Sequence, residues 1–285
     1  MVFRTRAWYP LPYMNTTITP PTAKDVAPWV EGLARLGYAA KALLYITVGL
    51  LAAQAGLGRG GRTTDTHGAL RFMNEATLGR VVLLVIAAGL LGYALWRLVE
   101  ALLDPEHRGS GLKGVALRTG SAARAVLHGG LAVAALRLAY GDRSGSADHP
   151  RYWTARAFEL PAGELVVWLA ALSITGYGLY QLYRAWAPKL GRQLQLGKIP
   201  ERASGVVIGV SRFGIAARGV VFCLVGLLLA RAAARHDAGD AGGLRESLGA
   251  VAELGRWPFV VVALGLVAYG VYELVNARYR RIRVG

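Results

Sequence analysis

The heptapeptide Arg35-Leu-Gly-Tyr-Ala-Ala-Lys41 returns twice further along the chain without gaps. The second copy is Arg118-Thr-Gly-Ser-Ala-Ala-Arg124, and the third is Arg212-Phe-Gly-Ile-Ala-Ala-Arg218. Each copy begins with arginine, has glycine third, carries two alanines and ends with a basic residue. Self-similarity at a long period indicates repeated supersecondary units.

A second motif follows each copy at a nearly constant distance. A glycine opens another apolar segment at Gly79, Gly163 and Gly255, and the ends of these segments share a tyrosine followed three residues later by a second aromatic residue. These aromatic pairs are Tyr93 and Trp96, Tyr177 and Tyr180, and Tyr269 and Tyr272. Two motifs at matching offsets predict a two-helix hairpin that is used three times. We expect the hairpins over 29–112, 113–205 and 206–285, after an irregular, proline-rich arm over 1–28.

Six apolar segments, two for each hairpin, cover 36–57, 79–99, 119–140, 163–183, 213–230 and 257–275. A helix needs about 20 residues to cross the hydrocarbon core of a bilayer. Arginines interrupt the third and fifth segments and leave shorter apolar runs there. We still predict that both segments span the membrane, because arginines near helix ends can snorkel and because the repeat requires a helix at each place. The sequence therefore predicts an all-α polytopic membrane protein with six transmembrane helices in pseudo-three-fold order.

Composition supports this class of protein. Hydrophobic residues make up 54% of the 285 residues and charged residues 18%, which excludes a disordered chain. The single cysteine excludes a disulfide scaffold and any site with several thiolate ligands. Short connecting helices are expected over 66–76, 152–159 and 243–254, and Thr64, Asp65 and Thr66 offer N-cap chemistry to the first.

The net charge of +16 is interpreted as a topology signal. Eighteen of the 33 basic residues lie on the side of the two termini and 12 on the opposite side, while the 17 acidic residues divide 7 to 10. The more basic side should be cytoplasmic. We therefore expect both termini inside and contact with anionic lipids, and no nucleic-acid partner. The paired aromatic residues at the ends of the second helices are expected to form an interfacial belt.

The repeat resembles the bacterial DUF1206 family. The resemblance rests on Arg-x-Gly-x-Ala-Ala-Lys/Arg opening a first helix and Gly-Tyr-x-x-aromatic ending a second, and it extends from about residue 28 to residue 283. It implies a six-helix protein of three hairpins in a bacterial plasma membrane, and it carries no catalytic residues. This chain departs from the pattern at His128, which stands at an otherwise aromatic position, and at Ala268, which replaces a glycine.

One face of each first helix carries a small residue, a cation and a ring at four-residue spacing, which places them on one side of a helix. These stripes are Gly37–Lys41–Tyr45, Gly120–Arg124–His128 and Gly214–Arg218–Phe222. In one interpretation the cations snorkel to headgroups or bind helix C-termini, and the stripe is a packing face. In the other, Lys41, Arg124 and Arg218 surround one axis and bind a lipid headgroup or a small anion.

Other polar residues in the segments have ordinary interpretations. His128 is expected to be a polar packing residue rather than a haem ligand, and Cys223 a small hydrophobe. Glu100 and Glu273 lie at predicted helix ends, where Glu100 could pair with Arg97 and Glu273 with Asn276 as ordinary surface chemistry.

No enzyme motif, metal site or cofactor site is expected. The sequence favours a non-enzymatic integral membrane protein that binds a partner protein or an anionic lipid, and that could be a small subunit of a membrane complex. An anion channel or transporter that uses the three cations is the alternative. An accessory subunit that holds a hydrophobic cofactor is a third.

Overall fold

The computed structural model describes residues 28–104, 111–142, 149–187 and 201–279, and these residues form helices and connections. The expected irregular arm over 1–28 lies almost entirely outside the described residues. Six long helices correspond to the six expected spans: α1 (Pro28–Gly56), α3 (Gly79–Leu103), α4 (Leu112–Ala139), α6 (Gly163–Trp186), α8 (Glu201–Arg235) and α10 (Arg256–Tyr279). All six are long and apolar enough to cross a membrane, as expected for a membrane-embedded protein.

The third and fifth apolar segments, in which arginines shorten the uninterrupted apolar run, form full-length helices. α4 has 28 residues and α8 has 35, which correspond to about 42 and 52 Å at a rise of about 1.5 Å per residue. The arginines that shorten the apolar runs lie inside these helices and do not end them. The helices are longer than the apolar runs because a charged residue is compatible with helical backbone.

Short helices connect the long ones within each hairpin, as expected. They are α2 (Thr66–Asn74), α5 (His149–Phe158) and α9 (Leu244–Glu253), with a 3₁₀ turn, η2 (Ala238–Asp240), before α9. The Asp65 carboxylate accepts a hydrogen bond from the Gly68 amide at 2.7 Å and is the N-cap of α2.

The Glu246 carboxylate caps α9 by accepting the Gly243 amide at 2.8 Å. Burial acts to raise the pKa of this carboxyl, but the Gly243 amide and the Arg245 guanidinium outweigh it and hold the pKa below its ordinary value. The carboxylate form therefore stabilises the start of α9.

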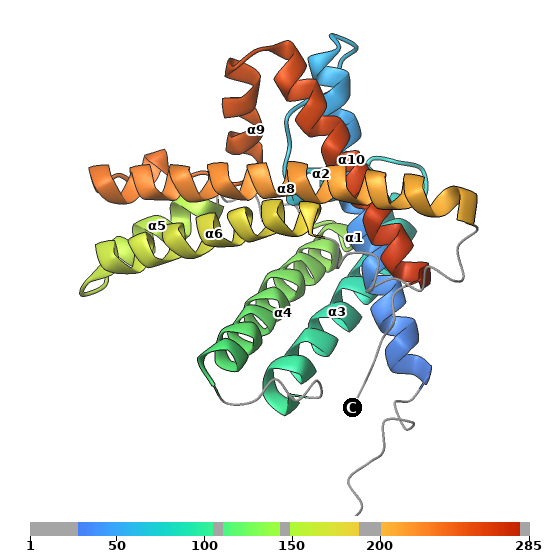
Figure 1. Cartoon of the computed structure of the whole chain (residues 1–285), viewed down its shortest axis with the longest axis horizontal. Coiled ribbons are helices and arrows are strands. Elements are labelled where there is room, and N and C mark those ends of the chain that lie inside the picture. The colour runs from blue at the N-terminus through green and yellow to red at the C-terminus, as the bar shows by residue number, and fades with distance from the viewer. Residues whose placement is uncertain (1–27, 105–110, 143–148, 188–200, 280–285) are drawn as a thin grey trace, which may run out of the picture.

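The long helices pair mainly between repeats. α1 packs along α10, α3 along α4, and α6 along α8, and these three pairs extend in different directions from a common centre (Figure 1). Each pair joins the second helix of one hairpin to the first helix of the next, and α10 returns to α1 to close the cycle. Within hairpins, α1 also packs on α3 and α8 on α10. The described parts of α4 and α6 have no comparable packing on each other.

Glycines allow the backbones of paired helices to approach closely. A Cβ added to Gly49 of α1 would lie 2.7 Å from the carbonyl oxygen of Ala263 on α10. A Cβ added to Gly270 would lie 2.9 Å from the carbonyl oxygen of Ala42 on α1. Small residues at such crossings are typical of membrane helices, whose association depends on close packing rather than on hydrophobicity.

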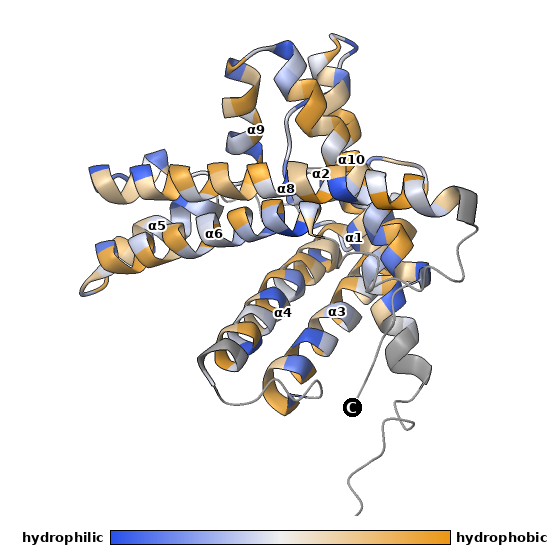
Figure 2. Cartoon of the chain, viewed as in Figure 1, coloured by the Kyte–Doolittle hydropathy of each residue, from blue (hydrophilic) through white to orange (hydrophobic). Residues whose placement is uncertain are grey.

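Hydrophobic residues are spread along the whole length of the long helices (Figure 2). Exposure is greatest for α4 and α6, where Val126 is 75% exposed and Leu172 is 71% exposed. The most buried spans are α1, α3 and α10. In a membrane protein such exposed apolar side chains face lipid.

The Gly49 crossing can be tested by substitution. We expect Gly49→Leu to destabilise the protein by about 1–3 kcal/mol, because the new side chain overpacks the contact of α1 with α10. Gly209→Leu is the control, since a Cβ at exposed Gly209 meets nothing within 4 Å. Thermal unfolding in detergent measures both. Equal melting temperatures for the two variants would contradict the crossing.

Candidate functional site

Three ring pairs at the centre of the fold show its pseudo-three-fold order. In each pair, the ring of a first helix packs against the tyrosine of the preceding repeat's second helix. The centroid distances are 4.7 Å for Tyr45 with Tyr269, 4.7 Å for His128 with Tyr93, and 5.1 Å for Phe222 with Tyr177. The three helix pairs therefore meet through equivalent contacts, one from each repeat.

Lys41 and Glu273 form a buried ion pair beside these rings. The Lys41 Nζ lies 2.8 Å from Glu273 Oε1, and the two side chains are 8% and 3% exposed. Tyr269 donates its hydroxyl hydrogen to the same carboxylate oxygen. The Lys41 ammonium also lies 4.7 Å from the centroid of the Tyr93 ring, within cation–π range. This cluster joins the first long helix to the last.

Arg218 lies in a cage of rings. Its guanidinium carbon is 4.5 Å from the ring centroid of Phe222 and 4.8 Å from that of Tyr269. It donates hydrogen bonds to the hydroxyls of Tyr45, at 3.1 Å, and Tyr177, at 3.2 Å. These neutral groups stabilise the guanidinium without cancelling its charge, and no ion pair of Arg218 with a described carboxylate is present.

A second ion pair lies on α3. Arg97 Nη1 is 2.5 Å from Glu100 Oε2, the two side chains are 8% and 5% exposed, and Ser121 of α4 donates to the same oxygen at 3.1 Å. Arg97 is four residues after its repeat's tyrosine, and Gln181 and Glu273 occupy the equivalent positions in the other repeats. Gln181 Oε1 and Glu273 Oε2 are buried and have no hydrogen-bond partner among the described residues, so the centre has capacity for ordered water.

Arg124 differs from the other two cations of the stripe. Its side chain is half-buried, and no ion pair or hydrogen bond links its guanidinium to the described residues. Its backbone carbonyl lies 2.8 Å from Nδ1 of His128, one turn further along α4. Tyr177, in the other helix of the same hairpin, lies within electrostatic reach of Arg124.

The first arginine of the heptapeptide caps a neighbouring helix in two repeats. Arg35 donates to the carbonyls of Ala277 and Arg278 at the end of α10, at 2.6 and 2.8 Å. Arg118 donates to the equivalent carbonyls at the end of α3, those of Ala101 and Leu102, at 2.8 and 3.2 Å. A cation at a helix C-terminus satisfies otherwise unpaired carbonyls and interacts favourably with the helix dipole.

The expected aromatic belt is wrong for most of its members. Trp96 and Tyr272 are 7% and 3% exposed, and Tyr93 and Tyr269 are also buried. Tyr93 and Tyr269 are buried because they pack both on the first helix of their own hairpin and on the ring of the next repeat. Tyr180, which is 56% exposed, is the clearest exception, and Tyr177 is half-buried.

The interpretation of the two glutamates as surface groups is also wrong. Glu100 does pair with Arg97, as expected, but the pair is buried, and Glu273 pairs with Lys41 rather than with Asn276. The signal that could have found Glu273 and Arg97 is the equivalent polar position four residues after each tyrosine, whereas Glu100 lies outside that pattern. Whether Lys41, Arg124 and Arg218 bind an anion stays a prediction.

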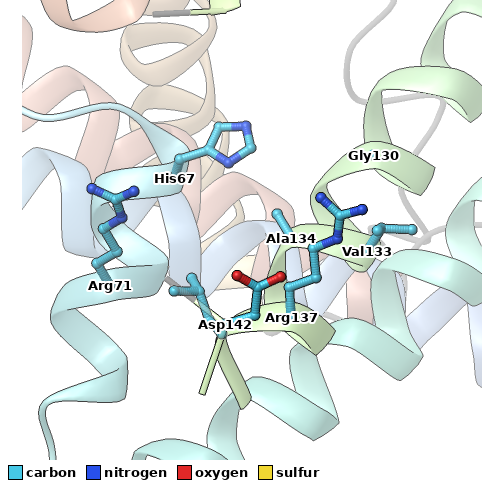
Figure 3. Close-up of a pocket in the computed structure, with 8 residues that line it drawn as sticks. His67, Arg71, Gly130, Val133, Ala134, Arg137 and Asp142 are labelled. Atoms are coloured by element: carbon cyan, nitrogen blue, oxygen red, sulfur yellow. The ribbon is translucent and has the colours of Figure 1, made fainter. Parts of the chain in front are cut away.

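A separate shallow pocket of about 110 Å³ lies between α2 and the C-terminal part of α4 (Figure 3). His67 and Arg71 of α2 line one side, and Arg137 and Asp142 line the other. Arg137 is 13 residues beyond Arg124 in sequence, about 20 Å along the helix. This pocket is therefore not part of the central site.

Removing the charge of Glu273 should destabilise the fold. Glu273→Gln leaves the Lys41 ammonium buried without a carboxylate, and we expect a loss of about 3–5 kcal/mol. The double variant Lys41→Met, Glu273→Leu removes both charges and should be more stable than the single variant. Thermal unfolding in detergent compares them, with exposed Glu253→Gln as control. Wild-type stability of Glu273→Gln would show that the pair is not required.

Comparison with known proteins agrees with the three-hairpin arrangement. The family described as Domain of Unknown Function (DUF1206) matches the chain three times, at residues 36–104, 119–187 and 213–280. The uncharacterized protein YxxB of Bacillus subtilis is 27% identical over 264 residues, covering 91% of this chain and 94% of that protein. No solved structure matches. The three family matches cover most of the residues that build the hairpins and the central site, and the chain belongs to the DUF1206 family.

Proposed function

We propose that this protein is a non-enzymatic integral membrane protein that binds the headgroup of an anionic lipid at its centre. The observation that carries the proposal is the surplus of positive charge there. Glu273 neutralises Lys41 and Glu100 neutralises Arg97, whereas Arg124 and Arg218 form no ion pair with a described carboxylate. A charge inside a membrane-spanning segment is costly unless it is paired or hydrated.

An anionic headgroup complements this arrangement. Arginine presents several N–H donors in a planar fork that suits a phosphate or carboxylate group. The Arg218 guanidinium uses two hydrogen bonds on tyrosine hydroxyls and retains further donor capacity. The expected ring of three cations is thereby reduced to Arg124 and Arg218, since Lys41 already has a carboxylate partner.

Packing at the centre favours binding over conduction. The three ring pairs and the buried Lys41–Glu273 pair occupy the region where the helix pairs meet. His128 packs against Tyr93, which supports its interpretation as a packing residue rather than as a cofactor ligand. The proposal therefore needs no catalytic group and no cofactor.

The proposed location is the bacterial plasma membrane, with both termini in the cytoplasm. This proposal is supported by the even number of candidate spans and by the 18 of 33 basic residues that the sequence assigns to the side of the termini. The relative from Bacillus subtilis supports a bacterial setting.

Lipid binding can be measured with the purified, delipidated protein. Titration calorimetry with dioctanoyl phosphatidic acid should show saturable binding to wild type, and Arg218→Gln should weaken it at least about tenfold, or about 1.4 kcal/mol, because a charge-assisted contact is lost. Arg59→Gln, at an exposed loop residue, should leave binding unchanged.

Other ligands and a flux measurement separate binding of an anionic lipid from binding of a free anion and from anion conduction. Dioctanoyl phosphatidylcholine should bind more weakly than phosphatidic acid, and inorganic phosphate tests whether a free anion suffices. Absence of saturable phosphatidic acid binding by wild type, or equal binding by Arg218→Gln, would overturn the proposal. Anion flux through liposomes that Arg218→Gln abolishes would favour conduction instead.

A further inference from the structure

The two helices of a hairpin do not approach each other equally closely in the three hairpins. In the first hairpin, a Cβ on Gly37 of α1 would lie 2.5 Å from the Tyr93 Cβ on α3. In the third, a Cβ on Gly214 of α8 would lie 2.2 Å from the Tyr269 amide nitrogen on α10. These equivalent glycines therefore hold the two helices of their hairpins in backbone contact.

The second hairpin lacks this contact. Gly120 is the equivalent glycine on α4, and a Cβ there would meet within 4 Å only Nη2 of Arg124, at 3.7 Å. The described parts of α4 and α6 have no packing comparable to that of α1 on α3 or of α8 on α10. α4 and α6 belong to different helix pairs, which diverge from the centre in Figure 1. The close contact between the two helices of a hairpin is therefore missing in the second hairpin. We call this place between α4 and α6 the seam, and the first and third hairpins closed.

The cation of the second hairpin, Arg124, also lacks a contact that its equivalents in the closed hairpins make. In the closed hairpins, Lys41 lies 4.7 Å from the Tyr93 centroid and Arg218 lies 4.8 Å from the Tyr269 centroid. Arg124 and Tyr177 are the equivalent pair, and they form no such cation–π contact. Both side chains are half-buried, and Tyr177 accepts a hydrogen bond from Arg218. Tyr177 therefore links the second hairpin to the caged Arg218.

Apolar side chains are exposed on both helices of the second hairpin. Val126 and Leu127 of α4 are 75% and 65% exposed, and Leu169 and Leu172 of α6 are 55% and 71% exposed. Acyl chains can lie against such surfaces while a charged headgroup contacts the arginines. The two carboxylates near the centre already form ion pairs with Lys41 and Arg97, so their charge is balanced and an anionic headgroup suits the remaining arginines better than a zwitterionic one.

We propose that the seam between α4 and α6 admits a lipid sideways from the bilayer, and that this lipid carries a wholly anionic phosphate or carboxylate headgroup that binds Arg124 and then Arg218. This inference rests on the proposed lipid-binding function and adds the route and the headgroup class. Gly120 lies one turn before Arg124 on the same face of α4, so it lines the route.

Filling the seam tests the route. Gly120→Leu adds a side chain where little stands nearby, so it should fold with a near-wild-type melting temperature and bind dioctanoyl phosphatidic acid at least about tenfold more weakly. Gly205→Leu on α8, where a Cβ meets nothing within 4 Å, is the matched control and should bind like wild type. Wild type should bind phosphatidic acid and octanoic acid more tightly than dioctanoyl phosphatidylethanolamine.

The outcomes separate the two proposals. Wild-type binding by Gly120→Leu, together with lost binding by Arg218→Gln, would overturn the lateral route and leave the lipid-binding function standing. Absence of binding by wild type would overturn both. A measurement on unaltered protein covers the case in which Gly120→Leu does not fold: photoreactive phosphatidic acid should crosslink to α4 and α6. Crosslinks confined to α1, α3 and α10 would overturn the route.

Discussion

The fold depends on how a bilayer protein accommodates cations inside its spans. An isolated ammonium in hydrocarbon is costly, and the contact between Lys41 and Glu273, which are 232 positions apart in sequence, offsets part of that cost. The pair connects α1 to α10 and thereby closes the cycle of three helix pairs. The same two helices also approach each other closely at Gly49 and Gly270. The ion pair and the close helix crossing thus hold α1 and α10 together.

Repetition supplies the symmetric part of the centre, and departures from it supply the chemistry. The three ring pairs are nearly identical in distance. The residues four positions after the repeated tyrosines differ completely: they are Arg97, Gln181 and Glu273. The carboxylate that neutralises Lys41 therefore comes from the third repeat alone, and Arg218 relies on rings and hydroxyls instead. The second repeat departs furthest, because α4 and α6 do not pack together and Arg124 is left facing the seam.

The apolar segments and the two repeated motifs predicted the six long helices and the three hairpins. The loops predicted the short connecting helices, with Asp65 among three candidate caps of the first one. The sequence did not predict that helices pair mainly between repeats. A repeat shows which residues are equivalent, but both faces of a membrane helix are apolar, so the pattern does not show which face meets which neighbour. For this reason Tyr93 and Tyr269 were expected at the membrane interface and Glu273 at the surface. The repeat pointed to Lys41, Arg124 and Arg218 as equivalent cations, but their different surroundings depend on contacts between repeats.

An experimental density map of the protein in lipid nanodiscs tests the central claim most directly. The claim is that the positive charge of Arg124 and Arg218 lies at an open seam and is complemented by a bound anion. We predict that α4 and α6 stand apart, that Glu273 contacts Lys41, and that non-protein density lies against the guanidinium groups of Arg124 and Arg218. A map in which α4 packs on α6, with the Arg124 guanidinium stacked on Tyr177 and no density beside either arginine, would contradict it.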